Sequence, residues 1–170
     1  LFPAGAGTAG AGCNMAFDRR LLVELGGFDD ALDTGPPLPG GGDLDMFYRV
    51  IHSGRAIGYE PAYAVYHEHR RTEDELRHQD FTWGLGFMAY LDKTASALPE
   101  ERGSVRALRR WWLVRMLREL RAARRGRATR TAGDVRAELK GGLIGSLGEY
   151  RRSRRRIERI RSRAGGEATS

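Results

Sequence analysis

Apolar residues recur every three or four positions in several long stretches of the chain, which is the spacing of one helix face. One such face, near residue 50, is formed by Leu44, Phe47, Val50 and Ile51. The longest pattern covers residues 105–125, with arginines crowding the opposite side, and its apolar positions are Val105, Leu108, Trp112, Leu113, Met116 and Leu120. The spacing predicts helices over 19–25, 43–53, 73–91, 105–125, 134–150 and 151–163.

Residues at the expected ends of three of these helices support the assignment. Asp18 precedes the first helix and is a good N-cap, and the glycines at 26–27 stop that helix. Gly54 closes the second helix. Thr72 and Glu75 have the spacing of a capping box, which predicts the start of the third. The last helix, "RRSRRRIERIRSR", has too little apolar surface to fold unless it packs against another element.

Shorter segments have the composition and alternation of strands. "CNMAF" (13–17) is a short strand candidate, and "AIGYEP" (56–61) and "AYAVYHEH" (62–69) predict two more around Pro61. The segment 28–42, with three prolines and four glycines, predicts a long loop shaped for a ligand. Strands alternating with helices give an α/β fold class.

Charge divides the chain into two unequal parts. Residues 1–101 carry 8 Lys/Arg and 16 Asp/Glu, a balance of −8, whereas residues 102–170 carry 21 Lys/Arg and 6 Asp/Glu, a balance of +15. The change falls at "LPEERGS", which has the Pro, Gly and Ser of a connector. We therefore expect an acidic part that bears the site, followed by a basic appendage.

Composition also bears on the compartment. The single cysteine, Cys13, has no internal disulfide partner, which fits a reducing compartment. The first residues lack a basic leader, and no apolar stretch approaches the roughly 20 residues that span a bilayer. We expect a cytoplasmic protein that is soluble or peripheral on the inner face of the cell membrane.

The stretch "GGGDLD" is the first candidate for chemistry, and two interpretations compete there. Asp43 and Asp45 begin a helix, where carboxylates commonly meet free N–H groups and the helix dipole. Alternatively, Gly41 and Gly42 let a ligand approach the backbone closely, and a carboxylate beside them accepts a proton from a hydroxyl nucleophile.

The wider pattern favours the second interpretation. The pieces "GAGCNMAF", "GGFDD", "GGGDLD", "YEP" and a strand ending in His occur together and in order over about residues 8–92. In this the chain resembles the C-terminal half of the catalytic domain of family-two glycosyltransferases, which are inverting enzymes that use nucleotide sugars. The resemblance implies a partial GT-A domain over 1–95, which a basic helical extension follows over 96–163. The composition of the last residues predicts a disordered tail over 164–170.

The resemblance assigns roles to individual residues. It makes Asp43 the general base that deprotonates the acceptor hydroxyl, and it places Asp45 as a support for the loop. Gly42 stands where the family commonly has a glutamate that helps to hold the acceptor, a departure that concerns acceptor binding. Arg49 pairs with one of the carboxylates or is a solvated surface residue. Asn14 lies on a strand that lines the donor pocket or is a strand-end amide.

The resemblance also implies a divalent metal, Mn²⁺ or Mg²⁺, bound to the donor diphosphate. A histidine at the position of His67 helps to hold it, and imidazole favours Mn²⁺ over Mg²⁺. His67 is otherwise a polar strand-end residue, or forms a transition-metal pair with His69 that lacks a third ligand. The family's Asp-x-Asp motif at a strand end is missing here, so we expect the 170-residue chain alone to be inactive.

The basic helices have several interpretations. They pack on the first part of the chain through their apolar face, and their surplus arginine suits an anionic membrane surface, in keeping with enzymes that use glycan or lipid-linked acceptors in cell-surface glycan synthesis. The charge would also suit nucleic acid, but no nucleic-acid-binding signature accompanies it. A fragment that kept its fold and lost its chemistry is the remaining alternative.

Overall fold

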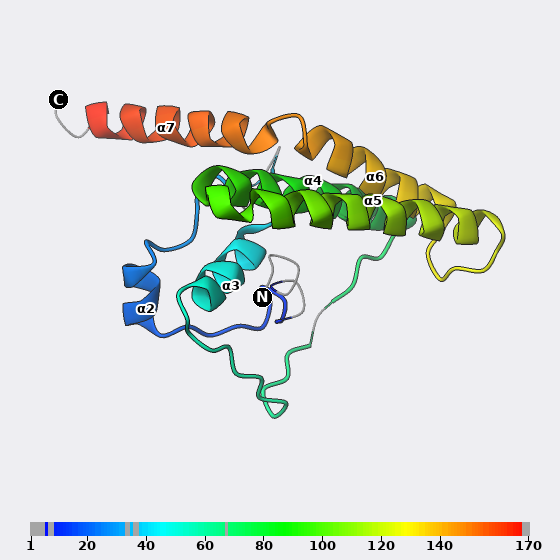
Figure 1. Ribbon diagram of the computed structural model, residues 1–170, viewed down its shortest axis with the longest axis horizontal. Helices are drawn as coiled ribbons and strands as arrows, with labels where there is room; N and C mark the ends of the chain where they lie inside the picture. Colours follow the sequence, from blue (N-terminus) through cyan, green and yellow to red (C-terminus); the bar gives the residue numbers. More distant parts are fainter. Residues whose placement is uncertain (1–5, 7–8, 33–34, 36–37, 67, 168–170) are drawn as a thin grey trace.

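The structure is a computed structural model that describes residues 6, 9–32, 35, 38–66 and 68–167, and Figure 1 shows its arrangement. The described elements are α2 (Arg19–Glu24), α3 (Gly42–His52), α4 (Glu73–Ala97), the 3₁₀ turn η1 (Pro99–Glu101), α5 (Arg102–Arg124), α6 (Ala132–Gly145) and α7 (Glu149–Glu167). None of the described residues forms a β-strand. The described part is therefore all-helical, and the predicted α/β class with a partial GT-A domain is wrong.

The predicted strands fail because they do not pair. An extended segment becomes a strand only when a neighbour completes its ladder of backbone hydrogen bonds. Residues 13–17 meet the 56–66 segment through one bond, in which the Asn14 side-chain amide donates to the Tyr63 carbonyl at 2.9 Å. The second segment is also largely solvated, since the side chains of Tyr59, Tyr63 and Tyr66 are exposed. Alternation was present in the sequence, but it did not correspond to a buried face.

The long helices form a bundle around α4. The short turn η1 reverses the chain, so that α5 runs back along α4, and α6 and α7 follow along the upper side of the bundle in Figure 1. α4 contacts α3, α5, α6 and α7. α3 lies below the bundle in the same view, and α2 lies to one side. α4 is thus the element against which both the acidic and the basic part of the chain pack.

Glycines bring α4 and α6 into backbone contact. A Cβ atom added at Gly84 would collide with the Glu138 carbonyl of α6, and one at Gly141 would collide with the Phe81 carbonyl of α4. At Gly145, a Cβ would lie 2.5 Å from the Leu85 carbonyl oxygen. Only glycine permits such a close approach of two helices. We call Gly84, Gly141 and Gly145 the glycine seam.

The predicted helix ends are confirmed where a local signal set them. Asp18 accepts hydrogen bonds from the amides of Arg20 and Leu21, and the Thr72 capping box begins α4. α4 runs to Ala97, six residues beyond the predicted end. The predicted helix 134–150 is divided instead, because α6 ends at Gly145 and Gly148 has a φ of +84° just before α7.

The apolar face of α5 is confirmed except at one edge. Val105, Leu108, Trp112 and Met116 are buried in the main core with residues of α3, α4 and α6. Leu113, which was predicted to share this face, is 43% exposed. The contact surface of α5 is narrower than its apolar stripe, and part of that stripe faces solvent.

α7 packs against other elements, as its small apolar surface requires. Tyr150 and Ser153 are buried, and Ile157 packs against the cluster of Ala31, Leu32, Leu38, Leu85 and Ala89. The helix continues to Glu167, so the predicted tail is helical as far as that residue. No helix in the described ranges combines the length and the apolar character needed to cross a bilayer.

Candidate functional site

The glycine run before α3 is held by α4. Gly40 and Gly41 have φ angles of +112° and +99°, a conformation that favours glycine. A Cβ at Gly41 would lie 2.7 Å from the carbonyl oxygen of Gly86 on α4. The sequence suggested a ligand at this backbone, but the α4 backbone occupies the place next to it. Gly41 is also the N-cap of α3 and offers no side-chain cap.

Asp43 lies in the first turn of α3, with its carboxylate oriented by two backbone amides. Oδ1 accepts from the Leu44 N–H at 2.8 Å, and Oδ2 accepts from the Gly12 N–H at 3.1 Å. The side chain therefore reaches across to the N-terminal segment and does not occupy the N-cap position. It is half-buried, which leaves lone pairs of the carboxylate open to a neighbouring cavity.

That cavity, the aromatic cavity, has a volume of about 890 Å³ and lies between the start of α3 and the helices α4, α5 and α6. Asp43 and Glu138 supply carboxylates to its wall. The other lining residues are Gly12, Cys13, Met15, Gly40, Gly41, Leu44, Trp83, Gly86, Phe87, Leu108, Trp111, Trp112, Arg115 and Arg130. All three tryptophans of the chain thus border one cavity.

Trp112 is the fixed wall of the aromatic cavity. Its indole rests on Gly142, where any Cβ would collide with the ring, and its Nε1–H donates to Glu138 Oε1 at 3.3 Å. Phe87 packs beside it with the ring centroids 6.3 Å apart. Trp111 and Trp83 are instead more than half exposed, at 55% and 56%. The cavity therefore has one buried aromatic wall and two aromatic side chains at its rim.

The two arginines of the aromatic cavity differ in what they contact. Arg130 is paired with Asp80 at 2.8 Å, Glu138 at 2.7 Å and Glu119 at 3.3 Å. Burial raises the pKa of Asp80, although the Arg130 guanidinium acts to lower it. Arg115 lies over the ring of Trp111, 5.6 Å from the centroid, and forms no ion pair with a described carboxylate. Arg130 is engaged in structure, whereas Arg115 is available to a ligand.

Asp45 faces a different part of the molecule. Its Oδ2 accepts from Arg49 Nε at 2.8 Å and from Lys93 Nζ at 2.6 Å, and its side chain is 3% exposed. Arg49 also donates to the carbonyls of Leu25 and Gly27. These bonds tie α3 to the end of α2 and to α4, which is a loop-supporting role. Arg49 is thus paired with a carboxylate, the first of the two alternatives in the sequence.

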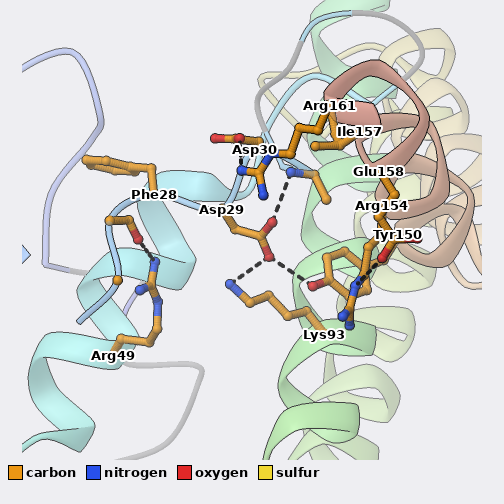
Figure 2. A pocket seen from close by; sticks show the side chains of 13 residues that line it. Phe28, Asp29, Asp30, Arg49, Lys93, Tyr150, Arg154, Ile157, Glu158 and Arg161 are labelled. Carbon is orange, nitrogen blue, oxygen red and sulfur yellow. Dashed lines mark hydrogen bonds and ion pairs between the residues drawn. The ribbon is translucent and has the colours of Figure 1, made fainter. Parts of the chain in front are cut away.

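Lys93 carries this network on to the C-terminal helix, as Figure 2 shows. Its Nζ is 2.9 Å from Asp29 Oδ2, which also accepts from the Tyr150 hydroxyl of α7 at 2.9 Å. Burial would raise the pKa of Asp29, but the hydrogen bonds from Lys93, the Ala31 amide and Tyr150 lower it. Asp29 is therefore a charged junction between α4, α7 and the loop after α2.

The small cavity at this junction, about 370 Å³, is lined by charges that pair with one another. In Figure 2, Arg154 reaches Glu158 on the same helix, and Arg161 reaches Asp30 on the loop. Lys93 and Arg49 are occupied by the carboxylates described above. The arrangement connects α7 to the loop and leaves no described cation unpaired toward the cavity.

The structure brings only part of the predicted site together. Asp43 and Gly41 line the aromatic cavity, and Gly42 is buried at the start of α3. Asn14 is exposed and is not part of the cavity wall. His67 lies outside the described residues. The site residues that the sequence did not single out are Trp83, Trp111, Arg115 and Glu138, which no local motif marks because three separate helices bring them together.

The described residues do not supply the implied metal site. Asp43 and Asp45 diverge, one toward the aromatic cavity and the other toward Arg49 and Lys93. Among the described residues, no group of three or more His, Cys, Asp or Glu side chains is placed to hold a metal ion. Mn²⁺ or Mg²⁺ therefore stays a prediction from the resemblance.

Comparisons with known proteins add nothing to these assignments. The chain was compared with protein-family models, with curated proteins and with solved structures, and none of them matches it. The resemblance to glycosyltransferases is accordingly carried by the sequence motifs alone. What can be said of function follows from Asp43, the aromatic side chains and the charges around them.

Proposed function

We propose that the aromatic cavity binds a carbohydrate acceptor, and that Asp43 is the general base in sugar transfer from a nucleotide-sugar donor. The observation that carries the proposal is the Asp43 carboxylate, oriented by the amides of Gly12 and Leu44 at the edge of a cavity bordered by three tryptophans. A fixed carboxylate beside aromatic surfaces suits a ligand with both hydroxyl groups and an apolar face.

The aromatic residues match the apolar side of a sugar. The C–H face of a pyranose ring packs on an indole and removes apolar surface from water, while its hydroxyl groups remain at the edge. Trp111 and Trp83, which are 55% and 56% exposed, offer indole surface for such packing at the opening, and the buried Trp112 forms the wall behind them. Carboxylate oxygens of Asp43 and Glu138 are acceptors for the hydroxyl hydrogens.

The proposed step uses Asp43 only as a proton acceptor. The acceptor hydroxyl gives its proton to Asp43 as its oxygen forms a bond to the anomeric carbon of the donor. The bond from that carbon to the nucleoside diphosphate breaks, and the leaving group takes the electron pair. Attack from the face opposite to the leaving group inverts the configuration. In this scheme Asp43 and the aromatic cavity act only on the acceptor.

The test is a substitution of Asp43, with transfer compared between the altered and the unaltered protein. Asp43→Asn should reduce transfer from nucleotide sugars to glycan acceptors by roughly 10²–10⁴, the contribution of a general base. Acceptor affinity, measured by tryptophan fluorescence in the 170-residue chain, should change far less than the rate, because the amide keeps the size of the carboxylate and loses one of its two acceptor oxygens, so that one of the bonds from Gly12 and Leu44 is lost. Product is measured by separation of radiolabelled glycan.

A matched control is available on the surface. Asp74 is an exposed carboxylate in the first turn of α4, so Asp74→Asn makes the same chemical change away from the cavity. It should leave both transfer and affinity unchanged. Full transfer by the Asp43→Asn protein would overturn the catalytic role, and failure of the chain to bind any glycan would overturn the cavity as an acceptor site.

A further inference from the structure

The outer face of α5 presents apolar side chains to solvent. Leu113, Val114 and Leu117 are 43%, 41% and 41% exposed. Val114 and Leu117 lie on the side away from the buried face of α5, and Leu113 lies at the edge of that face. Trp111 is exposed at the edge of the same surface. Figure 1 shows α5 on the near side of the bundle, in front of α4, with no described element drawn over it.

Arginines alternate with these apolar residues. Positions 110, 114, 117 and 121 recur at the three- and four-residue spacing of one helix face, and they are Arg110, Val114, Leu117 and Arg121. Arg106 and Arg118 lie beside this stripe and are also exposed. The α5 face is defined here as Arg106, Arg110, Trp111, Leu113, Val114, Leu117, Arg118 and Arg121.

The charge of the α5 face is not neutralised within the described part of the molecule. None of its four arginines forms an ion pair with a described carboxylate, whereas Arg77 on α4 and Arg152 and Arg154 on α7 do. The single carboxylate of α5 in the described structure, Glu119, is paired with Arg130. A helix face with surplus cations and exposed apolar groups is complementary to a surface that is both anionic and apolar.

We propose that the α5 face binds the surface of an anionic lipid bilayer. Leu113, Val114 and Leu117 would enter the boundary between headgroups and acyl chains, as the apolar side of an interfacial helix does. The arginine stems can lie along the same boundary while their guanidinium groups remain with the lipid phosphates. Trp111 stands at the edge of the face, in the position that interfacial tryptophans favour.

Two other partners fit the α5 face less well. Nucleic acid would pair with the arginines, but phosphates and base edges leave Leu113, Val114 and Leu117 without a complementary surface. A second copy of the chain, joined by twofold symmetry, would place the same patch against itself and bring arginines against arginines. A bilayer satisfies the charged and the apolar groups together.

The experiment is sedimentation of the 170-residue chain with lipid vesicles. We expect it to bind vesicles of phosphatidylcholine with phosphatidylserine, to bind pure phosphatidylcholine at least tenfold more weakly, and to lose affinity with added salt. Val114→Asp/Leu117→Asp and Arg110→Gln/Arg121→Gln should each weaken binding about tenfold or more, because they remove the apolar and the charged contribution separately. Circular dichroism verifies that both variants fold.

Matched controls come from α2, which also has exposed apolar and basic residues. Val23→Asp and Arg19→Gln/Arg20→Gln repeat the same chemical changes there, and should leave vesicle binding unchanged. The proposal is overturned if the α5 variants bind vesicles like the unaltered chain. It is also overturned if the chain binds duplex DNA and not vesicles, or if sedimentation shows a dimer that the α5 variants abolish.

Discussion

Lys93 stands at the centre of a chain of charges that no short motif predicts. Among the described residues, it is the one cation that contacts both Asp29 and Asp45, which lie 16 positions apart in the sequence and belong to different segments. Its side chain is 14% exposed, so both ion pairs are largely removed from water. In such surroundings an unpaired charge costs much more than it does at the surface.

Removal of the Lys93 ammonium should therefore destabilise the protein strongly. We expect Lys93→Met to lower the free energy of unfolding by about 3 kcal/mol, the lower part of the range for a broken buried pair, because Arg49 still contacts Asp45. Urea unfolding followed by circular dichroism measures the change.

Arg154 provides the surface comparison. Arg154 and Glu158 are 66% and 61% exposed, and Arg154→Met should cost less than about 1 kcal/mol. Equal losses in the two variants would mean that burial adds nothing to the Lys93 pairs.

Among the elements, α4 and α6 show which structural features a local sequence pattern predicts and which it does not. The capping box at Thr72 predicted the start of α4 because a cap is a contact between residues three positions apart. The predicted strand 62–69 failed because pairing depends on a distant segment, and the described residues of this segment form no ladder with one, although Asn14 donates a hydrogen bond to Tyr63. The contacts of the glycine seam likewise depend on distant segments, since they join residues more than 50 positions apart.

The glycine seam makes a sharp prediction about small substitutions. Gly141→Ala places a methyl group against the Phe81 carbonyl, so the helices must separate, and we expect a loss of about 1–3 kcal/mol in the free energy of unfolding. Thermal and urea denaturation both report it.

A substitution at Gly103 tests whether the predicted loss of stability comes from the close contact at the glycine seam and not from replacing a helical glycine in general. It lies in α5 with nothing near its Cβ position, and Gly103→Ala should stabilise the protein by up to about 1 kcal/mol through helix propensity. A stabilising Gly141→Ala would show that α4 and α6 are not in backbone contact.

At the scale of the molecule, α7 is joined to the loop after α2 by Asp29 and Tyr150. The ordinary pKa of 3.8 is lowered at Asp29 in the folded protein. A lowered pKa means that the unfolded chain binds a proton more readily, so the stability from Asp29 is present above pH 3.8 and is lost as the pH falls through the folded pKa.

The Asp29→Asn protein should reveal this linkage. The difference in free energy of unfolding between the unaltered chain and Asp29→Asn should be large near neutral pH and should shrink well below pH 3.8. Asp80, whose pKa is raised by burial, affects stability in the opposite direction, but it cancels because both proteins contain it. A difference that does not change with pH would contradict the role of the charged Asp29.

The candidate site combines residues that the sequence marks with residues that it does not. Asp43 was singled out by its place after a glycine run, and the aromatic cavity does border it. Trp111, Arg115 and Glu138 carry no motif, because their neighbourhood arises from the packing of α5 and α6 on α4. The sequence did predict the buried face of α5, but it did not predict that Leu113 is 43% exposed at the edge of that face.

The close approach of α4 and α6 has a consequence for any molecule that enters the aromatic cavity. Trp112 rests on a glycine of α6, and the backbone of α6 is already in contact with that of α4, so the indole has no room to retreat. Elsewhere in the cavity wall, Gly41 is in close contact with the backbone of Gly86. A ligand therefore meets a receptor that is already ordered and gives up little further conformational entropy on binding. Selectivity among ligands then follows from shape, because a rigid wall excludes ligands that a flexible wall would accommodate by moving.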